Sequence, residues 1–390
     1  MSRTLRSTTA ATAAAVTAIF ALAMAAGVAP ATASDSHDDD HDRDRDRDRA
    51  YVTVATGLNN PRQLSIGSSH RLYVAEAGTI DPNMCAAIPG AAAEFQVCGF
   101  TGSVTEVRRD GQQRRVVTGL PTLDFNGEVI GASDVDVNGN RISVLIGGMA
   151  AASSFRGAGP AEYAAFGTLR TGRLQSMPID GADLELAVDV LAHEVDANPD
   201  LNVPPDSNAT GFTRLGSKRW AIVDAGGNTL LKADRDGVQT LAVFPNGAPV
   251  PNPFGPGEVP PQAVPTDVAV GPDGAFYVSQ LTGFPFPTGG STIWRVNKDG
   301  DVTPYATGLT MVTSLEWRGD RLYAVQLDDS NFFDGHVGSL RRITPGGSVH
   351  EAVLSGLDAP YGLAIRGHDA YVTVGSVSSG GGSVIQVDLR

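Results

Sequence analysis

The chain has 390 residues, of which 46 are glycine and 24 are proline, and it carries a formal net charge of −14. An acidic chain with only three lysines is a poor match for nucleic acid or an anionic membrane surface, so neither is expected as a partner. No stretch of about 20 apolar residues follows the N-terminal region, so we expect no membrane span.

The first 50 residues predict two segments that precede the folded domain. Arg3 and Arg6 come before an Ala-rich apolar run, and Ala31-Thr32-Ala33 offers small residues for cleavage. This is the layout of a secretory signal peptide, predicted over residues 1–33. Residues 34–50, which include SDSHDDDHDRDRDRDR, have almost no apolar side chain to bury and are predicted to be disordered. We therefore expect a secreted, extracellular protein with one folded domain over residues 51–390.

The only two cysteines, Cys85 and Cys98, fall in one predicted loop. In an exported protein, a pair thirteen residues apart predicts a structural disulfide that closes the loop. A metal site would need more ligands than this pair offers, and a redox pair would more often be Cys-x-x-Cys.

Short alternating apolar runs broken by turn residues predict an all-β fold, and these runs recur as a repeat. Each unit has the order strand, turn, strand, variable loop, strand, tight turn, strand. VPTDVAVGPDGAFYVSQLTG, STIWRVNKDG and VTPYATGL form one unit, and LELAVDVLAHE is the predicted last strand of another. Four antiparallel strands per unit are typical of a β-propeller blade. Asp-Gly pairs are expected to supply the positive φ of the tight turns: Asp110–Gly111, Asp180–Gly181, Asp236–Gly237 and Asp299–Gly300.

Six units are visible, but the last contains only three strands. The missing strand is predicted at the N-terminus, because YVTVATGL at Tyr51–Leu58 matches VTPYATGL at Val302–Leu309. We therefore predict a six-bladed β-propeller of four-stranded antiparallel blades, in which the N-terminal strand completes the last blade and covers its edge. A long array of β-sandwiches would leave the terminal match unexplained. One apolar residue per first strand is expected to pack between blades: Leu64, Val135, Phe212, Val268, Leu315 and Leu363.

Long loops between the second and third strands should gather on one face of the disc, because the same connection recurs in each blade. These loops concentrate aromatic residues, among them Phe284 and Phe286 in LTGFPFP. The rings predict either an apolar platform for a ligand or pins that hold the loops onto the body. The other aromatic residues of these loops are Phe95, Phe100, Phe155, Tyr163, Phe166, Phe332 and Phe333.

The start of each innermost strand contributes one residue to the predicted mouth of the central channel. Oxygen ligands at these positions suit Ca²⁺ or Mg²⁺, and the candidate metal residues are Asp134, Asn208, Asp267 and Ser314. An ion there would act as a Lewis acid on a lactone or ester carbonyl, as in six-bladed metal-dependent lactonases. The alternative is that these residues cap turns and bind backbone N–H groups. Gln63 occupies the equivalent position in the first unit, with Gly211 and Gly362 in two others.

A second ring is predicted where the second strands end, and its members are candidates for ligand binding: Glu76, Asp224, Gln280 and Gln326, with Asp328 nearby. Gln63 joins these candidates from the first ring. No nucleophile elbow, zinc-binding helix or phosphate loop is present. The histidines of the domain are expected to lie on the surface.

Several stretches resemble the ScyD/ScyE family of exported propeller proteins. They are NPDLNVPPDSNATGFTRL, WAIVDAGGNTLLKADRDG and VPTDVAVGPDGAFYVSQLTGFPFPTGGSTIWRV, and the resemblance covers Tyr51–Arg390. It implies a propeller fold and export, with no defined reaction. We expect a monomer that binds an unidentified small molecule or protein, or acts as a scaffold, with a Ca- or Mg-dependent lactone or ester hydrolase as the alternative.

Overall fold

The computed structural model describes residues 50–87, 95–125, 127–148, 161–234, 236–330, 335–378 and 380–390. The predicted signal peptide and nearly all of the Asp/Arg/His-rich segment lie outside these residues, as do Phe155, Phe332 and Phe333. Only the backbone of Phe95 is described.

The chain is all-β and forms a succession of antiparallel sheets, six of which follow one another along the sequence. The first three sheets are built from β2 (Pro61–Ile66), β3 (Leu72–Glu76), β6 (Gly102–Val107) and β7 (Gln113–Leu120); β10 (Ala132–Asn138), β11 (Arg141–Ile146), β12 (Thr168–Arg173) and β14 (Glu185–Asp189); and β15 (Ala209–Gly216), β16 (Arg219–Asp224), β17 (Thr229–Asp234) and β18 (Gly237–Val243). A short strand, β13 (Ile179–Asp180), adds to β7 in parallel.

The last three sheets have the same order, in which each strand pairs with the next along the chain. They are β21 (Pro265–Val270), β22 (Phe276–Gln280), β23 (Ser291–Val296) and β24 (Val302–Leu309); β25 (Val312–Arg318), β26 (Arg321–Gln326), β27 (Val337–Arg342) and β28 (Glu351–Asp358); and β29 (Leu363–Arg366), β30 (Asp369–Val374) and β31 (Gly382–Asp388) with β1 (Val52–Leu58).

The first strands of these six sheets are the innermost elements, and they contact one another in a closed cycle. β2 contacts β10, and the contacts continue through β15, β21, β25 and β29 back to β2. The apolar residues predicted to pack between units are all buried, with exposed fractions from 2% at Val135 to 6% at Phe212. The core therefore lies between neighbouring sheets, as the repeat predicted.

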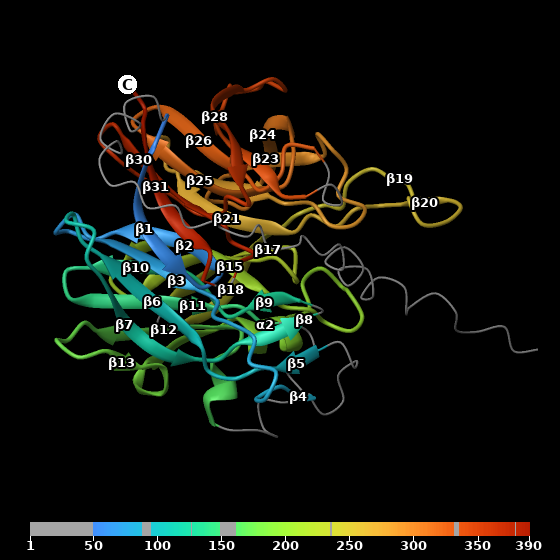
Figure 1. Ribbon diagram of the computed structural model, residues 1–390. Helices are drawn as coiled ribbons and strands as arrows, with labels where there is room; N and C mark the ends of the chain where they lie inside the picture. The colour runs from blue at the N-terminus through green and yellow to red at the C-terminus, as the bar shows by residue number, and fades with distance from the viewer. Residues whose placement is uncertain are drawn as a thin grey trace, which may run out of the picture.

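Strand β1 closes the sheet that the C-terminal strands begin, and this pairing is confirmed. It runs antiparallel to β31, with Val52 opposite Gln386 and Leu58 opposite Gly382. Ala55 and Leu58 are 4% and 2% exposed and pack in one cluster with Leu64 and Leu72 of the first sheet. The N-terminal strand thus links the sheet at the end of the chain to the sheet at its beginning (Figure 1).

Smaller elements gather on one side of the molecule, where the connections between second and third strands lie. Figure 1 shows helix α2, the β19–β20 hairpin and a small sheet on this side, which we call the loop side. The hairpin consists of β19 (Val250–Pro251) and β20 (Glu258–Val259); the small sheet of β4 (Ala86–Ala87), β5 (Phe95–Val97), β8 (Leu123–Phe125) and β9 (Glu128–Ile130); a 3-10 turn, η3 (Ala161–Ala165), precedes β12. A second 3-10 turn, η4 (Gly181–Asp183), directly follows β13, which lies on the opposite side in Figure 1.

Two local predictions are wrong, for identifiable reasons. The predicted strand LELAVDVLAHE ends at Asp189, whose carboxylate accepts the Ala192 N–H at 2.9 Å and caps helix α2 (Val190–Ala197). Asp180–Gly181 does not form a positive-φ hairpin turn, because Asp180 caps η4 instead. Glycine fits closely at 181, where a Cβ would lie 3.0 Å from Gly119 O and 2.8 Å from Leu120 Cδ2. Gly111, Gly237 and Gly300 do have the predicted positive φ.

The predicted disulfide between Cys85 and Cys98 is present and joins the β4 segment to the end of β5. No helix in the described part of the chain is long and apolar enough to cross a membrane. The disulfide is compatible with an extracellular protein.

The contribution of β1 can be tested by comparing two of its own side chains. Leu58→Ala should lower the free energy of unfolding by about 2–5 kcal/mol, because it leaves a cavity where two sheets meet. Val52→Ala, at a position 57% exposed, should change it by less than about 0.5 kcal/mol. Urea unfolding followed by tryptophan fluorescence measures both; equal effects would contradict the burial of Leu58 between the first and last sheets.

Candidate functional site

The predicted channel residues lie on inner strands around a central cavity of about 400 Å³. The inner strands of all six sheets line this cavity, which we call the axial channel. Gln63, Asp134 and Asp267 are among its lining residues, whereas Ser314 and Asn208 are not. Asn208 instead lines a second cavity nearer the starts of the inner strands. The structure therefore does not gather the four predicted metal ligands around one cavity.

The carboxylates of Asp134 and Asp267 each connect their own inner strand to the next inner strand along the chain. Asp134 Oδ2 accepts the N–H of Phe212 at 2.8 Å, and Asp267 Oδ2 accepts the N–H of Leu315 at 3.0 Å. Ser314 Oγ donates to Asp267 Oδ2 at 2.8 Å and accepts the N–H of Leu363 at 3.2 Å. The predicted alternative, in which these residues bind backbone N–H groups, describes these contacts.

A second tier of hydrogen bonds forms a ring just above the aspartates. Four inner strands each donate one hydroxyl to a carbonyl at or near the start of the next inner strand: Ser133 to Ala209 at 2.9 Å, Thr210 to Pro265 at 3.1 Å, Thr266 to Val312 at 2.7 Å and Thr313 to Tyr361 at 2.7 Å. Thr373 continues it from the last sheet to Arg62 O at 2.9 Å. Arg62 then donates to Val129 O at 2.7 Å, just before β10, and completes the cycle.

Glycine at two positions of the predicted column lets neighbouring strands approach closely enough for these bonds. A Cβ on Gly211 would lie 2.7 Å from Thr266 O, and a Cβ on Gly362 would lie 2.6 Å from Arg62 O. Both contacts are with backbone atoms that cannot move aside. Glycine in this column is therefore explained by packing at the axis.

Acidic side chains of the axial channel are held in an unfavourable electrostatic environment. Burial and the charge of Asp267 hold the pKa of Asp134 well above its usual range. Burial raises the pKa of Asp267 to about 6, and burial together with Asp267 raises the pKa of Glu316 to about 8. Glu316 lines the channel from β25 and was not among the predicted site residues.

No group of three or more His, Cys, Asp or Glu side chains is placed to hold a metal ion within the described ranges. The acidic and amide side chains that line the channel are Asp134, Asp136, Asp267, Glu316 and Gln63. Asp134 and Asp267 already accept backbone N–H groups, and Asp136 is paired with Arg214. Gln63 Nε2 itself donates to Thr313 O at 2.9 Å.

The members of the second predicted ring lie inside the sheets, where their side chains bond to other protein groups. Glu76 is 0% exposed, accepts from Asn59 N, Ser103 Oγ and Thr105 Oγ1, and pairs with Arg115 at 3.5 Å. Gln280 Oε1 accepts from Thr292 N and Trp294 Nε1, and Gln326 bonds Thr310 N and Asp329. Side chains along a strand alternate between the two faces of the sheet, so the residue that follows each ring member points to the opposite face.

Asp224 is also buried, and it orders the turn that follows β16. Its Oδ1 accepts the N–H groups of Asn208 at 2.6 Å, Gly226 at 3.2 Å and Gly227 at 3.3 Å, and its Oδ2 accepts Ser207 Oγ at 2.7 Å. Burial raises the pKa of Asp224 to about 6. Burial and the neighbouring carboxylates, chiefly that of Asp224, raise the pKa of Glu194 on α2 to about 8.

A cavity of about 110 Å³ opens where the inner strands begin, and we call it the axial pocket. It is lined by Leu281 and Leu327, each one residue beyond a predicted ring member, and by Ala225, which follows Asp224. The lining residues of this pocket at the second-strand ends therefore follow the predicted ring members by one position. The other lining residues are Arg62, Glu128, Asn208, Thr210, Val264, Thr266, His336, Tyr361, Ser376 and Val377.

Arg62 and Tyr361 form the fixed polar part of this pocket. Arg62 is 8% exposed, donates to Ser376 O at 2.6 Å and Val129 O at 2.7 Å, and lies 5.0 Å above the centre of the Tyr361 ring. These contacts use two of the five N–H groups of the guanidinium. Burial raises the pKa of Tyr361 to about 12, so its hydroxyl stays protonated and able to donate.

Glu128 and His336 complete the ionisable groups of the pocket. Burial raises the pKa of Glu128, an effect that the positive charge of Arg62 opposes. Burial lowers the pKa of His336, whose Nδ1 lies 3.9 Å from Asp328 Oδ2, so the ring is neutral above its lowered pKa. Its side chain is only 14% exposed, and His350 is 8% exposed, so the prediction that the histidines lie on the surface is wrong for these two.

The two phenylalanines of LTGFPFP have different roles. Phe286 is 1% exposed and packs with Met311, Leu327 and Ala359, so it pins the loop to the body and is not part of a ligand platform. Phe284 is half-buried, and its ring stacks on Phe254 of the β19–β20 hairpin with centroids 5.8 Å apart. Phe254 is 57% exposed, so this pair is the aromatic feature that the loop side presents.

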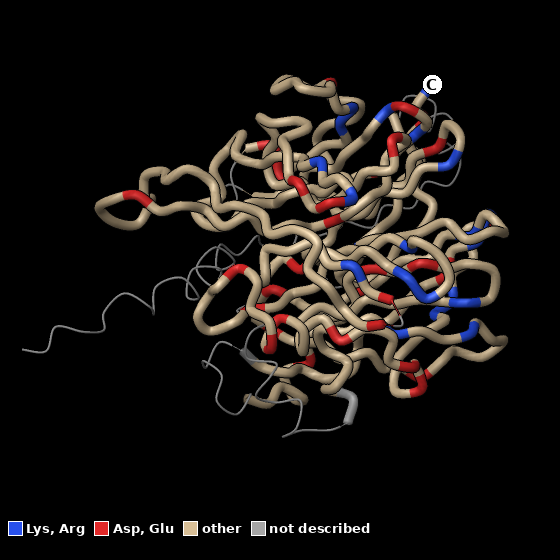
Figure 2. Tube along the Cα trace, turned by 180° about the vertical axis from the view of Figure 1, so that it is seen from behind, with Lys and Arg blue, Asp and Glu red and all other residues tan. Residues whose placement is uncertain are grey.

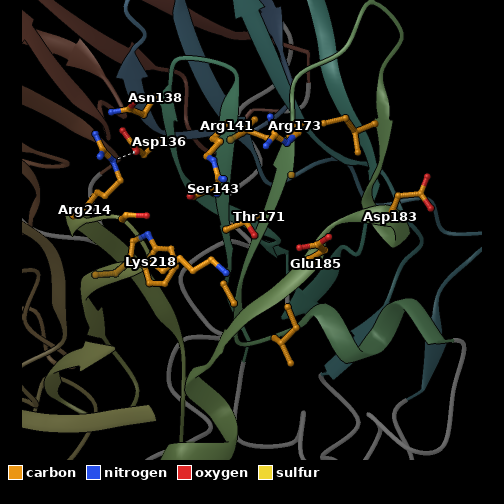
Figure 3. A pocket seen from close by; sticks show the side chains of 18 of the residues that line it. Asp136, Asn138, Arg141, Ser143, Thr171, Arg173, Asp183, Glu185, Arg214 and Lys218 are labelled. Carbon is orange, nitrogen blue, oxygen red and sulfur yellow. Dashed lines mark hydrogen bonds and ion pairs between the residues drawn. The ribbon is translucent and has the colours of Figure 1, made fainter. Parts of the chain in front are cut away.

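A larger groove of about 820 Å³ lies between the sheets that begin with β10 and β15. Figure 3 shows Arg141 and Arg173 close together in it, and the ion pair between Arg214 and Asp136 at 2.9 Å. Its lining carries four cations and four anions, so the groove has no net electrostatic preference for one class of ligand. The anions are Asp136, Asp183, Glu185 and Asp234, and the cations are Arg141, Arg173, Arg214 and Lys218.

Charge is unevenly distributed between the two sides of the molecule. In Figure 2, Lys and Arg lie mainly away from the β19–β20 hairpin, whereas Asp and Glu occur on both sides. The loop side is therefore the more acidic one, and Arg62 is an exception buried in its pocket.

Comparisons with known proteins bear on the fold. No family model matches the sequence, and no curated protein matches it in sequence. A gluconolactonase from Xanthomonas campestris has a similar structure, with a TM-score of 0.50 and 10% identity over 87% of this chain and 89% of that one. A glucose dehydrogenase (TM-score 0.48, 13% identity, 87% and 99% covered) and virginiamycin B lyase from Staphylococcus aureus (0.44, 10%, 86% and 98%) were also found. At such identities the likeness shows a propeller-like fold and nothing about activity.

Arg62, Glu128, His336 and Tyr361 line the axial pocket but were not predicted as site residues. Tyr361 had a usable signal, because it lies two residues before the last inner strand at a position equivalent to Arg62. Glu128 and His336 had none, because they lie in connections whose paths the repeat does not determine.

The electrostatic cost in the axial channel can be measured through Glu316. Because its pKa is raised in the folded state, the wild-type free energy of unfolding should fall as the pH rises from about 4.5 to about 8. Glu316→Gln should remove this loss, so its free energy of unfolding relative to wild type should rise by about 4 kcal/mol between pH 5 and pH 9. Urea unfolding at pH 5 and at pH 9 measures this change in the free energy of unfolding, and Glu185→Gln, at an exposed position, is the control. An unchanged pH dependence would show that Glu316 remains solvated.

Proposed function

We propose that the chain is an exported six-bladed β-propeller of the ScyD/ScyE type that binds a small ligand in the axial pocket. Six successive antiparallel sheets, the cycle of inner strands and the pairing of β1 with β31 support this blade count. The N-terminal sequence and the disulfide between Cys85 and Cys98 support export. The proposal makes the protein a binding or scaffold protein outside the cell, and a monomer.

The observation that carries the binding proposal is the fixed Arg62–Tyr361 pair beside the apolar walls of the pocket. Arg62 is oriented by two backbone carbonyls, so its remaining donors are ordered before any ligand arrives. Val264, Leu281 and Leu327 supply apolar walls beside it. Such a pocket suits a compact molecule with an apolar body and one carboxylate or carbonyl oxygen.

Benzoate, with neutral benzamide of the same shape, is the probe for this pocket. We expect saturation-transfer NMR and titration to show benzoate binding at least about tenfold more tightly than benzamide, because Arg62 donates to the charged oxygens. Tyr361→Ala should weaken benzoate binding about tenfold by removing the ring under Arg62. Tyr305→Ala, in a different cluster, is the matched control. Equal affinity of the two probes, or an unchanged affinity in Tyr361→Ala, would contradict the proposal.

A second candidate is a lactone or ester hydrolase that uses Ca²⁺ or Mg²⁺ in the axial channel. The observation in its favour is that Asp134 and Asp267 both line the channel, where the charge of Asp267 raises the pKa of Asp134. A cation between them would relieve that repulsion. The solved gluconolactonase with a similar fold makes lactones a reasonable substrate class to assay.

Hydrolysis of glucono-δ-lactone, followed by proton release, tests the second candidate. If it is correct, turnover should require Ca²⁺ or Mg²⁺ and should fall by at least about 100-fold in Asp134→Asn and Asp267→Asn. Glu185→Gln, the control variant, should hydrolyse the lactone at the wild-type rate. Hydrolysis that survives chelation or both substitutions would rule the channel out as the catalytic site.

A further inference from the structure

Two buried carboxylates face each other on the loop side, outside both the axial pocket and the axial channel. Glu194 projects from α2 and is 1% exposed, and Asp224 ends β16 and is 0% exposed. Both approach Gly227, where the position of a Cβ would be 2.5 Å from Glu194 Oε2 and 3.4 Å from Asp224 Oδ2. Only glycine leaves room for both oxygen atoms at this point.

The two carboxylates differ in how their oxygens are satisfied. Asp224 accepts four hydrogen bonds from Ser207, Asn208, Gly226 and Gly227. Glu194 Oε1 is buried and accepts none. A buried carboxylate oxygen without a donor costs free energy, so it requires a partner that the protein atoms do not supply.

The surroundings add negative charge and further oxygen atoms. Asp200 and Asp206 both act on Glu194 as like charges. Within the described residues no Lys or Arg lies at ion-pair distance from Glu194, Asp224 or Asp200. Asn198, one helical turn after Glu194, has a buried Oδ1 that also lacks a donor, and so does Thr229 Oγ1 next to the Gly226–Gly227 turn.

The loop that carries Asp200 is held in a defined conformation. Asp200 Oδ2 accepts from Asn202 Nδ2 at 2.6 Å and from Asn228 Nδ2 at 2.9 Å, which ties the loop after α2 to the turn after β16. Asn198 ends the helix in the left-handed region with φ of 40°. The C-terminal end of a helix also presents carbonyl oxygens and partial negative charge.

We propose that Glu194 and Asp224 bind a calcium ion over Gly227, a site distinct from the axial channel. Hard oxygen donors and the lack of sulfur or imidazole favour Ca²⁺ over transition metals. Only two acidic side chains meet at this point, and the described residues contain no group of three or more placed to hold a metal ion. The remaining oxygen ligands of the calcium ion would therefore come from Asn198, backbone carbonyls and water. The bound ion would tie α2 to the turn between β16 and β17.

The competing explanation is a proton shared between Glu194 and Asp224, which needs no metal. Glu194→Gln distinguishes the two, because it keeps the shape and removes the charge. Asp196→Asn, on the exposed face of the same helix, is the matched control. Asp267→Asn separates this site from the axial channel of the second candidate function.

Thermal unfolding of the full chain, stripped with EDTA and titrated with CaCl₂ or MgCl₂, is the test. We expect calcium at about 100 times its Kd to raise the wild-type Tm by about 5 °C, with the same rise in Asp196→Asn and Asp267→Asn and none in Glu194→Gln. A smaller response to magnesium is expected.

Three results would overturn the proposal. One is a wild-type protein that calcium does not stabilise while Glu194→Gln is more stable than it, which indicates the shared proton. Another is a full calcium response in Glu194→Gln, which places the ion elsewhere. The third is loss of the response only in Asp267→Asn, which assigns the ion to the axial channel.

Discussion

The hydrogen bonds between inner strands are the constraint on which the rest of the structure depends. Each hydroxyl donor, from Ser133 to Thr373, donates to a carbonyl of the following unit. Asp134, Asp267 and Ser314 form the neighbouring tier, in which each accepts an N–H group from the next inner strand. One such bond contributes only about 1 kcal/mol, but a closed ring leaves no unit without two neighbours. The same ring separates the axial pocket from the axial channel, so the two cavities have different chemistry.

This ring also explains why acidic residues at the axis do not by themselves indicate catalysis. A carboxylate that accepts N–H groups from the next strand is a structural element even when burial raises its pKa, as for Asp267. Burying the negative charge of this carboxylate still costs free energy, and a bound cation would offset that cost. By contrast, the Arg62 guanidinium keeps donors beyond those used by the backbone, which makes the axial pocket the better candidate for recognition of a ligand.

Asp224 connects the features of the loop side. Its carboxylate accepts the N–H of Asn208, which lines the axial pocket, and it faces Glu194 across Gly227. An ion bound by Glu194 and Asp224 would therefore be connected to a ligand in the axial pocket through Asp224, its hydrogen bond to Asn208, and Asn208 itself. The acidic character of the loop side is consistent with a cation there, and the balanced groove of Figure 3 has no such bias.

The sequence by itself determined the all-β class, the strand repeat, the return of the N-terminal strand and the disulfide between Cys85 and Cys98. Those features depend on alternation, turn residues and a local cysteine pair, all of which are written along the chain. The tertiary structure alone decided which polar residues at the axis are already satisfied, because a hydrogen-bond partner such as Phe212 for Asp134 is 78 residues away. It also decided that Leu281, and not Gln280, faces the pocket, since a shift of one residue reverses the side of a strand on which a side chain lies.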